Sequence, residues 1–222
     1  HHARVMDNEY RPASARIAEL SGADKGGLRV GAGPIWLVKI LPPVIAEFQK
    51  THPDIRVTLI GGVIDTLVPA VVSGDLDLIC VSLDFPDRSE LKKTALFEMN
   101  YILVVAPTHP MAGKEEVTPA DLATQRWLTL QSDYVGTQRL LAFFASSGVQ
   151  PPKISLETTS IHSLLETLRS GHYVAQIPEQ MLELAQEKGL IELPFKGTLW
   201  QTSAGLAQRG NATTSAALSA FI

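Results

Sequence analysis

The feature that most constrains the fold is an order of elements that occurs twice in the sequence. The stretches "VVSGDLDLIC" at 71–80 and "LRSGHYVAQIP" at 168–178 each place Ser-Gly shortly before an apolar, strand-like run. In both halves, this closing strand follows a predicted strand, helix, strand and helix. A helix is the usual crossover between parallel neighbours, so alternating strands and helices are typical of parallel sheets. The sequence therefore predicts an α/β fold with two parallel-sheet domains.

The first half begins with a short strand at Leu28–Val30, and "GAGP" turns the chain into a long helix. Apolar residues recur on one wide face of that helix at helical spacing: Trp36, Leu37, Ile40, Leu41, Val44, Ile45 and Phe48. Pro42 and Pro43 should kink the helix, because each removes a backbone donor. A strand in "THPDIRVTLIGG", a helix at Thr66–Val72 and a continuous apolar strand in "LDLICVSL" complete this half.

The second half follows the same order after a helix start in "TPADLA", with Thr118 as the cap and Pro119 at the first helical position. Strands are predicted in "RWLTL", "KISLETT" and "HYVAQIP", with helices between them at Gly136–Ser147 and Ser160–Ser170. A glycine follows each of these helices, and glycine is the residue that most readily ends a helix.

A further strand, "SAGLAQR", and an Ala-rich helix that ends at Ile222 remain after the second half. The economical placement returns them to the first domain, so the chain should cross between domains near Ala106 and again near Thr202. The predicted division has a leading segment at 1–26, a first lobe at 27–105 with 203–222, and a second lobe at 106–202. Open parallel sheets bind ligands at the carboxyl ends of their strands, so two facing lobes would share one ligand cleft.

Composition limits the classes of function. The chain has 222 residues, 45% of them hydrophobic, and a net charge of −4. The negative charge gives no electrostatic case for binding nucleic acid, and no apolar run reaches the ~20 residues that a membrane-spanning helix needs. His1 and His2 resemble the end of an expression tag. No signal peptide begins the chain, which favours a bacterial cytoplasmic location.

Motifs for catalysis or cofactor binding are absent from the sequence. "GAGPIW" has two of the glycines of G-x-G-x-x-G, and Trp36 stands at the third position, so no dinucleotide site is predicted. The histidines outside the first two positions lack metal-binding spacing, and no nucleophile stands in a recognisable motif. We therefore expect no enzyme activity, no cofactor and no metal.

Three residues that could suggest chemistry have simpler structural interpretations. Cys80 is the only cysteine and lies in an apolar strand, which favours a buried core thiol over a reactive one. Asp75 and Asp77 could form a paired-carboxylate site. The simpler interpretation is a turn aspartate and a strand-entry aspartate that accept hydrogen bonds from backbone amides.

The binding capacity that the sequence does offer lies at helix starts. Four segments join a predicted strand end to a helix start: Gly33–Ile35, Gly62–Ile64, Ser132–Thr137 and Thr159–Ile161. Backbone N–H groups there lack helical partners and carry the positive end of the helix dipole, so they can bind carboxylate, phosphate or sulfate. Each segment could also be an ordinary capped helix, but four around one cleft favour a small-molecule site.

Several stretches together resemble the effector-binding domain of LysR-type transcriptional regulators, over Gly27 to Ile222. They are "GLRVGAGP", "LPPVIAEFQKTHPDIRVTL", "LVPAVVSGDLDLICV", "LVVAPTHPMA", "TPADLATQRWLTL" and "IHSLLETLRSGHYVAQIP". The resemblance implies a fold of the type II periplasmic-binding-protein kind, with a small-molecule effector bound between two lobes. It also implies a homodimer or tetramer that binds promoter DNA through a helix-turn-helix domain absent from this chain, with Asn8–Leu20 as the end of a linker helix. A periplasmic solute-binding protein of an uptake system has the same fold and is the alternative.

The sequence departs from that family at positions where carboxylate-binding members often carry Ser or Thr. Gly33, Ile35 and Ile64 occupy them here, which predicts a more apolar wall in the first lobe. We expect a small anionic effector with an apolar body, whose anionic end lies against a helix start. The predicted ligand-binding residues are Gly33, Pro34, Ile35, Gly62, Ile64, Gln131, Thr159, Ser160, Ile161, Gln176, Ile177 and Pro178.

Overall fold

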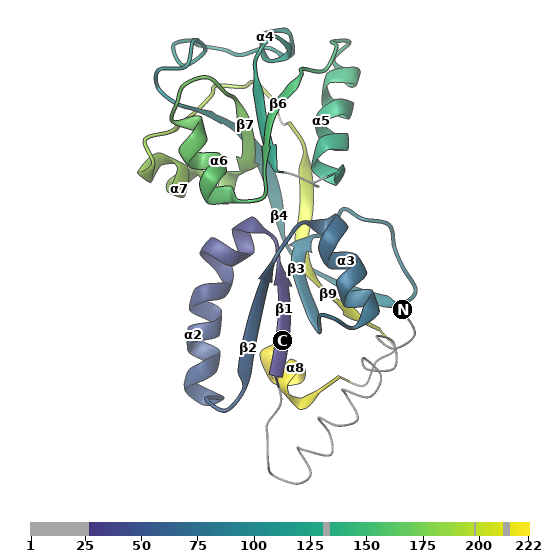
Figure 1. Ribbon diagram of the computed structural model, residues 1–222. Helices are drawn as coiled ribbons and strands as arrows, with labels where there is room; N and C mark the ends of the chain where they lie inside the picture. Colours follow the sequence, from purple (N-terminus) through teal and green to yellow (C-terminus); the bar gives the residue numbers. More distant parts are fainter. Residues whose placement is uncertain (1–26, 131–133, 198, 211–213) are drawn as a thin grey trace. The chain divides into compact units, whose positions relative to one another are not determined.

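The structure is a computed structural model that describes residues 27–130, 134–197, 199–210 and 214–222 (Figure 1). The predicted linker helix at Asn8–Leu20 lies outside these residues. Within the described ranges, no helix is long and apolar enough to cross a membrane.

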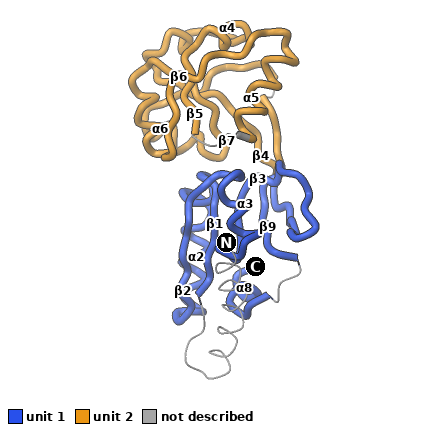
Figure 2. The backbone as a smooth tube through the Cα atoms, turned by 45° about the vertical axis from the view of Figure 1, so that its right-hand side comes forward, with its two compact units in different colours: residues 1–97, 203–222 blue, residues 98–202 orange. Residues whose placement is uncertain are grey.

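The chain folds into two compact units (Figure 2). Unit 1 takes residues from 1–97 and 203–222, and unit 2 takes residues 98–202. The chain leaves unit 1 within strand β4 (Leu91–Val105) and returns to it within strand β9 (Gln201–Arg209). Each unit therefore receives part of two long strands. The division into functional lobes at 27–105 and 106–202 stays a prediction.

Unit 1 contains a mixed sheet with the strand order β2–β1–β3–β9. The first three strands are parallel, with β1 in the middle: β1 (Gly27–Ala32), β2 (Arg56–Gly61) and β3 (Leu78–Ser82). Strand β9 runs antiparallel to β3, with a register from Leu78↔Gln208 to Ser82↔Ala204. The three predicted strands of the first half are confirmed, and the C-terminal strand makes the sheet mixed because it enters from the opposite end.

The long helix after the Gly-rich turn has two parts. A π-helical turn, η1 (Trp36–Ile40), leads directly into α2 (Leu41–Thr51). Pro42 and Pro43 lie in the first turn of α2, where their missing N–H groups interrupt the hydrogen-bond ladder that would continue from η1. The irregularity predicted at the prolines thus coincides with a change from π to α geometry.

Helix α3 (Ile64–Ser73) begins two residues before the predicted helix and ends at Gly74, which has the left-handed conformation at φ 82°. The guanidinium of Arg209 in β9 donates to the carbonyls of Val71 at 2.9 Å and Leu76 at 3.0 Å. The Val71 carbonyl also accepts from the Gly74 N–H at 3.2 Å, so Arg209 adds a second donor there and links β9 to the end of α3. The C-terminal strand therefore holds the end of α3.

The last helix, α8 (Ala216–Phe221), also belongs to unit 1. Its N-cap is Ser215, whose hydroxyl accepts a hydrogen bond from the Leu218 N–H at 3.2 Å. The ring of Phe221 meets the ring of Phe48 in α2 edge to face, with centroids 5.1 Å apart. The predicted C-terminal helix is confirmed in this shorter form.

Unit 2 contains the three predicted strands of the second half. Parallel strands β5 (Trp127–Leu130) and β6 (Ile154–Thr158) form one pair, and β7 (Ala175–Pro178) pairs antiparallel with β4. A parallel bridge between Trp127 and Val174 places β7 beside β5, through hydrogen bonds from Leu128 to Val174 and from Val174 to Arg126. The remaining elements are α5 (Tyr134–Ser146), α6 (Ile161–Leu168), η2 (Glu179–Met181), α7 (Leu182–Glu187) and β8 (Ile191–Glu192).

The core of unit 2 forms around Trp127 and Phe144, whose rings meet edge to face at a centroid distance of 5.9 Å. Both side chains have an exposed fraction of 0%. The indole Nε1–H of Trp127 donates to the carbonyl of Leu122 at 3.0 Å, so the buried polar atom has a partner. Aromatic packing and a satisfied N–H together fix this ring in the core.

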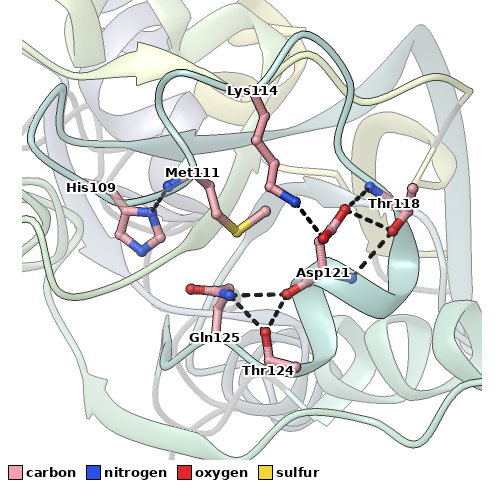
Figure 3. A network of polar contacts seen from close by, with 7 residues as sticks. All are labelled: His109, Met111, Lys114, Thr118, Asp121, Thr124 and Gln125. Atoms are coloured by element: carbon pink, nitrogen blue, oxygen red, sulfur yellow. Dashed lines mark hydrogen bonds and ion pairs between the residues drawn. The ribbon is translucent and has the colours of Figure 1, made fainter.

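Helix α4 (Pro119–Ala123) begins with the predicted cap, and Figure 3 shows its polar network. The Thr118 hydroxyl accepts from the Asp121 N–H at 3.2 Å, and the Asp121 carboxylate accepts from the Thr118 N–H at 2.9 Å. Lys114 also donates to Asp121, and its hydrogen bond is the largest of the contributions that lower the pKa of Asp121 to about 2. The reciprocal pair is a capping box, as the sequence pattern predicts.

Gly205 in β9 lies too close to β4 for any side chain. A Cβ atom at this position would be 2.1 Å from the carbonyl oxygen of Thr94 and 3.0 Å from the Cα atom of Ala95. We predict that Gly205→Ala lowers the free energy of unfolding by about 1–3 kcal/mol, because the strands must separate to make room. Urea denaturation of the wild type and the variant measures this difference.

Gly113→Ala is the matched control, because no atom lies within 4 Å of a Cβ at Gly113. This change should leave the free energy of unfolding within about 0.5 kcal/mol of the wild type. Equal unfolding midpoints for both variants would show that β4 and β9 do not approach as closely as described.

Candidate functional site

The five predicted site residues of unit 1 lie at the carboxyl ends of β1 and β2. Strands β1 and β2 pair in register up to Ala32↔Gly61. Beyond this pair, the Gly62 N–H donates to the Ala32 carbonyl at 3.1 Å. The structure thus brings the segment 33–35 and the segment 62–64 to one edge of the sheet.

The backbone N–H groups of the two glycines at this edge are already in use. Gly33 donates to the carbonyl of Cys80 at 2.9 Å, and Gly62 donates to Ala32. A Cβ at Gly62 would be 2.6 Å from the hydroxyl oxygen of Thr66 and 2.8 Å from a methyl carbon of Leu67. The prediction that these two N–H groups are free to bind a ligand is wrong, because each donates to a carbonyl group of a neighbouring strand. Gly62 serves close packing against α3.

The two isoleucines of this edge are core residues of unit 1. Ile35 has an exposed fraction of 3% and Ile64, the first residue of α3, an exposed fraction of 9%. Pro34 between the turn and the helix is half-buried. Their contact with a ligand stays a prediction, and any ligand that meets them would find an apolar surface.

Trp36 also lies at this edge and carries a polar atom, the indole Nε1. It was not among the ligand-binding residues predicted from the sequence. Its side chain has an exposed fraction of 3%, and its indole Nε1 has no hydrogen-bond partner among the described residues. The ring lies over Gly33, since a Cβ there would be 3.7 Å from Cδ1, the carbon next to Nε1. Its other side meets Phe97, with ring centroids 5.4 Å apart. The sequence signal was only an aromatic residue on an apolar helix face, which predicts core packing.

In unit 2, the predicted residues Thr159, Ser160 and Ile161 form the start of α6. Ser160 is the N-cap: its hydroxyl accepts from the Ser163 N–H at 3.3 Å, and its own N–H donates to the Thr158 hydroxyl at 3.2 Å. The first intrahelical bond runs from Leu164 to the Ser160 carbonyl at 3.0 Å. The N–H groups of the first turn before Ser163 precede this bond, so they have no helical acceptor.

The predicted residues of β7 do not share one face. Gln176 and Ile177 are successive residues of a strand, so their side chains point to opposite sides of the sheet. Ile177 has an exposed fraction of 1%. The Gln176 Oε1 atom is buried and lacks a hydrogen-bond partner among the described residues. Pro178 is half-buried and pairs with Tyr101 of β4, whereas Gln131 lies outside the described residues.

Thr129 in β5 is a second residue that the sequence-based list missed. Its exposed fraction is 7%, and its hydroxyl oxygen has no hydrogen-bond partner in the described part of the chain. The sequence does not indicate that the hydroxyl of this strand threonine is buried and unpaired, because its hydrogen-bond partners depend on tertiary packing.

Cys80, Asp77 and Asp75 each lie in surroundings that fit a structural role. Burial raises the pKa of the Cys80 thiol to about 12, so it stays protonated and inert, as the interpretation of a core thiol requires. Asp77 accepts from the Arg29 N–H at 2.8 Å, and Asp75 accepts from the Ser73 hydroxyl at 2.7 Å. Within the described ranges, no cluster of His, Cys, Asp or Glu could hold a metal ion. The arrangement can bind a small molecule through neutral hydrogen-bonding groups.

Comparison with known families identifies the chain. A family model described as the LysR substrate binding domain matches residues 21–222. The chain belongs to this family. MetR of Escherichia coli K12, an HTH-type transcriptional regulator, is 30% identical over 164 residues, which cover 73% of this chain and 51% of MetR. The chain thus spans about half the length of this LysR-family relative.

Solved structures of effector-binding domains share the fold. The effector-binding domain of QuiR in complex with shikimate has a TM-score of 0.74 at 20% identity, over 88% of this chain and 93% of QuiR's. The regulatory domain of CcmR from Synechocystis PCC6803, in complex with 2-PG, has a TM-score of 0.75 at 17% identity, with the same coverage of both chains. The predicted fold class, α/β of the type II periplasmic-binding-protein kind, is confirmed.

The α6 cap generates a prediction for this LysR-family domain. Ser160→Ala removes the acceptor of the Ser163 N–H and should lower the free energy of unfolding by about 0.5–2 kcal/mol. Ser163→Ala is the control, because Ser163 contributes only its backbone N–H to the cap. Urea unfolding followed by circular dichroism measures both variants, and equal midpoints would contradict the capping role.

Proposed function

We propose that this chain is the ligand-sensing regulatory part of a LysR-type transcriptional regulator and binds a small anionic, partly apolar effector in a cleft between two lobes. The family match over residues 21–222 carries the proposal. Two domains with this fold have been solved in complex with small molecules, QuiR with shikimate and CcmR with 2-PG. The proposed role is binding without catalysis.

The start of α6 is the proposed place for the anionic end of the effector. Its first-turn N–H groups have no helical acceptor, and a helix N-terminus favours negative charge by about 0.3–1 kcal/mol. Thr159, Ser160 and Ile161 are therefore proposed to contact the anion, with backbone donors as the main contribution. The Ser160 hydroxyl already accepts the capping bond from Ser163.

Ile35 and Ile64 are proposed to contact the apolar body of the effector, whereas Ile177 points to the opposite face of β7 from Gln176 and is left out of this wall. Both isoleucines of the wall are buried just after the carboxyl ends of β1 and β2. Burying an isoleucine-sized contact contributes roughly 1.5–3 kcal/mol, which would favour aromatic or branched acids over fully polar ones. The Gly33–Pro34 turn and Gly62 would bring this wall to the effector, and Gln131, Gln176 and Pro178 would border its polar substituents.

The full-length regulator is proposed to act as a homodimer or tetramer in the bacterial cytoplasm, on promoter DNA. MetR, of which this chain matches about half, is named an HTH-type regulator. A helix-turn-helix domain outside this chain would contact DNA, because a net charge of −4 gives this chain no overall electrostatic attraction to phosphates. The effector would alter DNA binding through the assembly.

Calorimetry against a panel of metabolites tests the effector class. We predict that the hits are anions with an apolar body and that Ile64→Asp abolishes their binding, because the new charge repels the anion and disrupts the apolar contact. Ile64→Val keeps the apolar surface and should bind within a few-fold of the wild type. Thermal unfolding checks that each variant is folded.

Two outcomes would contradict the proposed effector class. One is a set of hits that are all uncharged or cationic. The other is a folded Ile64→Asp variant with wild-type affinity.

Self-association in solution is a further prediction, and the helix η1–α2 is its proposed surface. Val38 and Val44 on this helix have exposed fractions of 43% and 44%, and exposed apolar residues grouped on one element mark interfaces. We predict an oligomer in sedimentation velocity that Val44→Lys weakens at least about tenfold, since a charge must then be desolvated. A wild-type chain that stays monomeric at high concentration would contradict this prediction.

A further inference from the structure

Two buried polar atoms in unit 2 lack hydrogen-bond partners. They are the hydroxyl oxygen of Thr129 in β5 and the amide oxygen Oε1 of Gln176 in β7, and neither has a partner among the described residues. The Thr129 side chain has an exposed fraction of 7%, so bulk solvent has little access to its hydroxyl. Buried polar atoms are nearly always hydrogen-bonded in native proteins, and an unpaired one is destabilising. Two such atoms in one unit call for a structural reason.

A single parallel bridge relates the segments that carry these two side chains. The bridge Trp127↔Val174 fixes the parallel register of β5 and β7, with hydrogen bonds from Leu128 to Val174 and from Val174 to Arg126. Thr129 and Gln176 each follow their bridge residue by two positions, and side chains two apart on a strand lie on the same face. Continued by two residues, this register would bring the two polar groups to facing positions on adjacent strands, which are about 4.8 Å apart.

Among the described residues, the surroundings of the pair are mostly apolar. The same face carries Trp127, Val174 and Leu103, which pairs with Gln176 across β4; all three have exposed fractions of 0–1%. The polar groups of nearby elements are already engaged: the Trp127 Nε1–H donates to Leu122, and the Thr158 hydroxyl accepts from Ser160. The pair also lies near the carboxyl ends of β5 and β7, the place where α/β sheets bind ligands.

We infer that Thr129 and Gln176 form a polar subsite for a hydroxyl group of the effector. The amide oxygen of Gln176 only accepts hydrogen bonds, whereas the threonine hydroxyl can donate one. A single ligand hydroxyl matches both, because it donates to Gln176 Oε1 and accepts from Thr129 Oγ1. The inference rests on the proposed function and narrows the effector to a hydroxylated carboxylic acid.

The ligand-free chain provides the first test. Thr129→Val removes an unpaired buried hydroxyl at constant shape and should raise the urea midpoint of unfolding. Thr158→Val is the matched control: it removes a hydroxyl that accepts from Ser160, so it should lower the midpoint. A Thr129→Val variant that loses stability as Thr158→Val does would show that the Thr129 hydroxyl has a structural partner, which overturns the inference.

Binding of matched probe pairs provides the second test. Calorimetry compares shikimate with cyclohex-1-ene-1-carboxylate, which has the same ring and carboxylate without the hydroxyls, and 3,4-dihydroxybenzoate with benzoate. In at least one pair, the hydroxylated acid should bind the wild type about tenfold more tightly than its partner, because the deoxy acid leaves the polar pair buried and unpaired. Thr129→Val and Gln176→Met should each remove most of this preference while the deoxy acid binds as before.

The outcomes separate this inference from the proposed function. Equal or tighter binding of the deoxy acids to the wild type overturns the hydroxyl subsite and leaves an anion-binding domain intact. A preference for hydroxylated acids that survives in both variants places hydroxyl recognition elsewhere and overturns the assignment. If no probe binds the folded wild type, the proposed binding of such acids fails, and the subsite fails with it.

Discussion

Two backbone hydrogen bonds close the sheet edge of unit 1, from Gly33 to Cys80 and from Gly62 to Ala32. They link the ends of three parallel strands, so the connections to η1 and α3 leave the sheet at fixed, adjacent points. A side chain at Gly62 would collide with Thr66 and Leu67, which shows how closely the helix follows the strand. Because of these bonds, the N–H groups of Gly33 and Gly62 are not available to a ligand, although Gly-rich turns often use such groups to bind anions. The ligand recognition proposed for this unit would therefore depend on side chains and on donors further along the helices.

Local chemistry made much of the fold predictable from the sequence. The Thr118 capping box, the Ser160 cap and the left-handed Gly74 each follow from a few neighbouring residues, and all occur as the patterns indicate. Strand β4 was not predicted, although it has 15 residues. Its burial changes along its length, from a mostly exposed first part to the continuously buried 103–105, because it serves both units. No single hydrophobic period can describe such a strand.

The candidate site was less predictable, because polar satisfaction is a tertiary property. Trp36 and Trp127 are both buried aromatic residues, yet only Trp127 finds a carbonyl for its Nε1–H. Nothing in the sequence near either residue distinguishes them. Strand alternation, by contrast, was available from sequence and separates Gln176 from Ile177. The predicted list placed both beside the ligand, and the structure directs them to opposite faces of β7.

The charges of the described residues indicate how an anion would be held. Lys93, Lys114 and Lys188 each form an ion pair with a carboxylate: Asp87, Asp121 and Glu166. Lys188 and Arg169 together lower the pKa of Glu166 to about 2, so the pairing persists throughout the physiological range of pH. At these three lysines an incoming anion would compete with the paired carboxylate, so the proposed anion contact rests on neutral donors, chiefly helix N–H groups. A hydrogen bond from a neutral donor requires a short distance and a well-aligned acceptor. A charge, by contrast, attracts an anion from any direction and over distances up to the screening length of about 10 Å. Selectivity would then follow the positions of hydrogen-bonding groups on the effector more closely than its total charge.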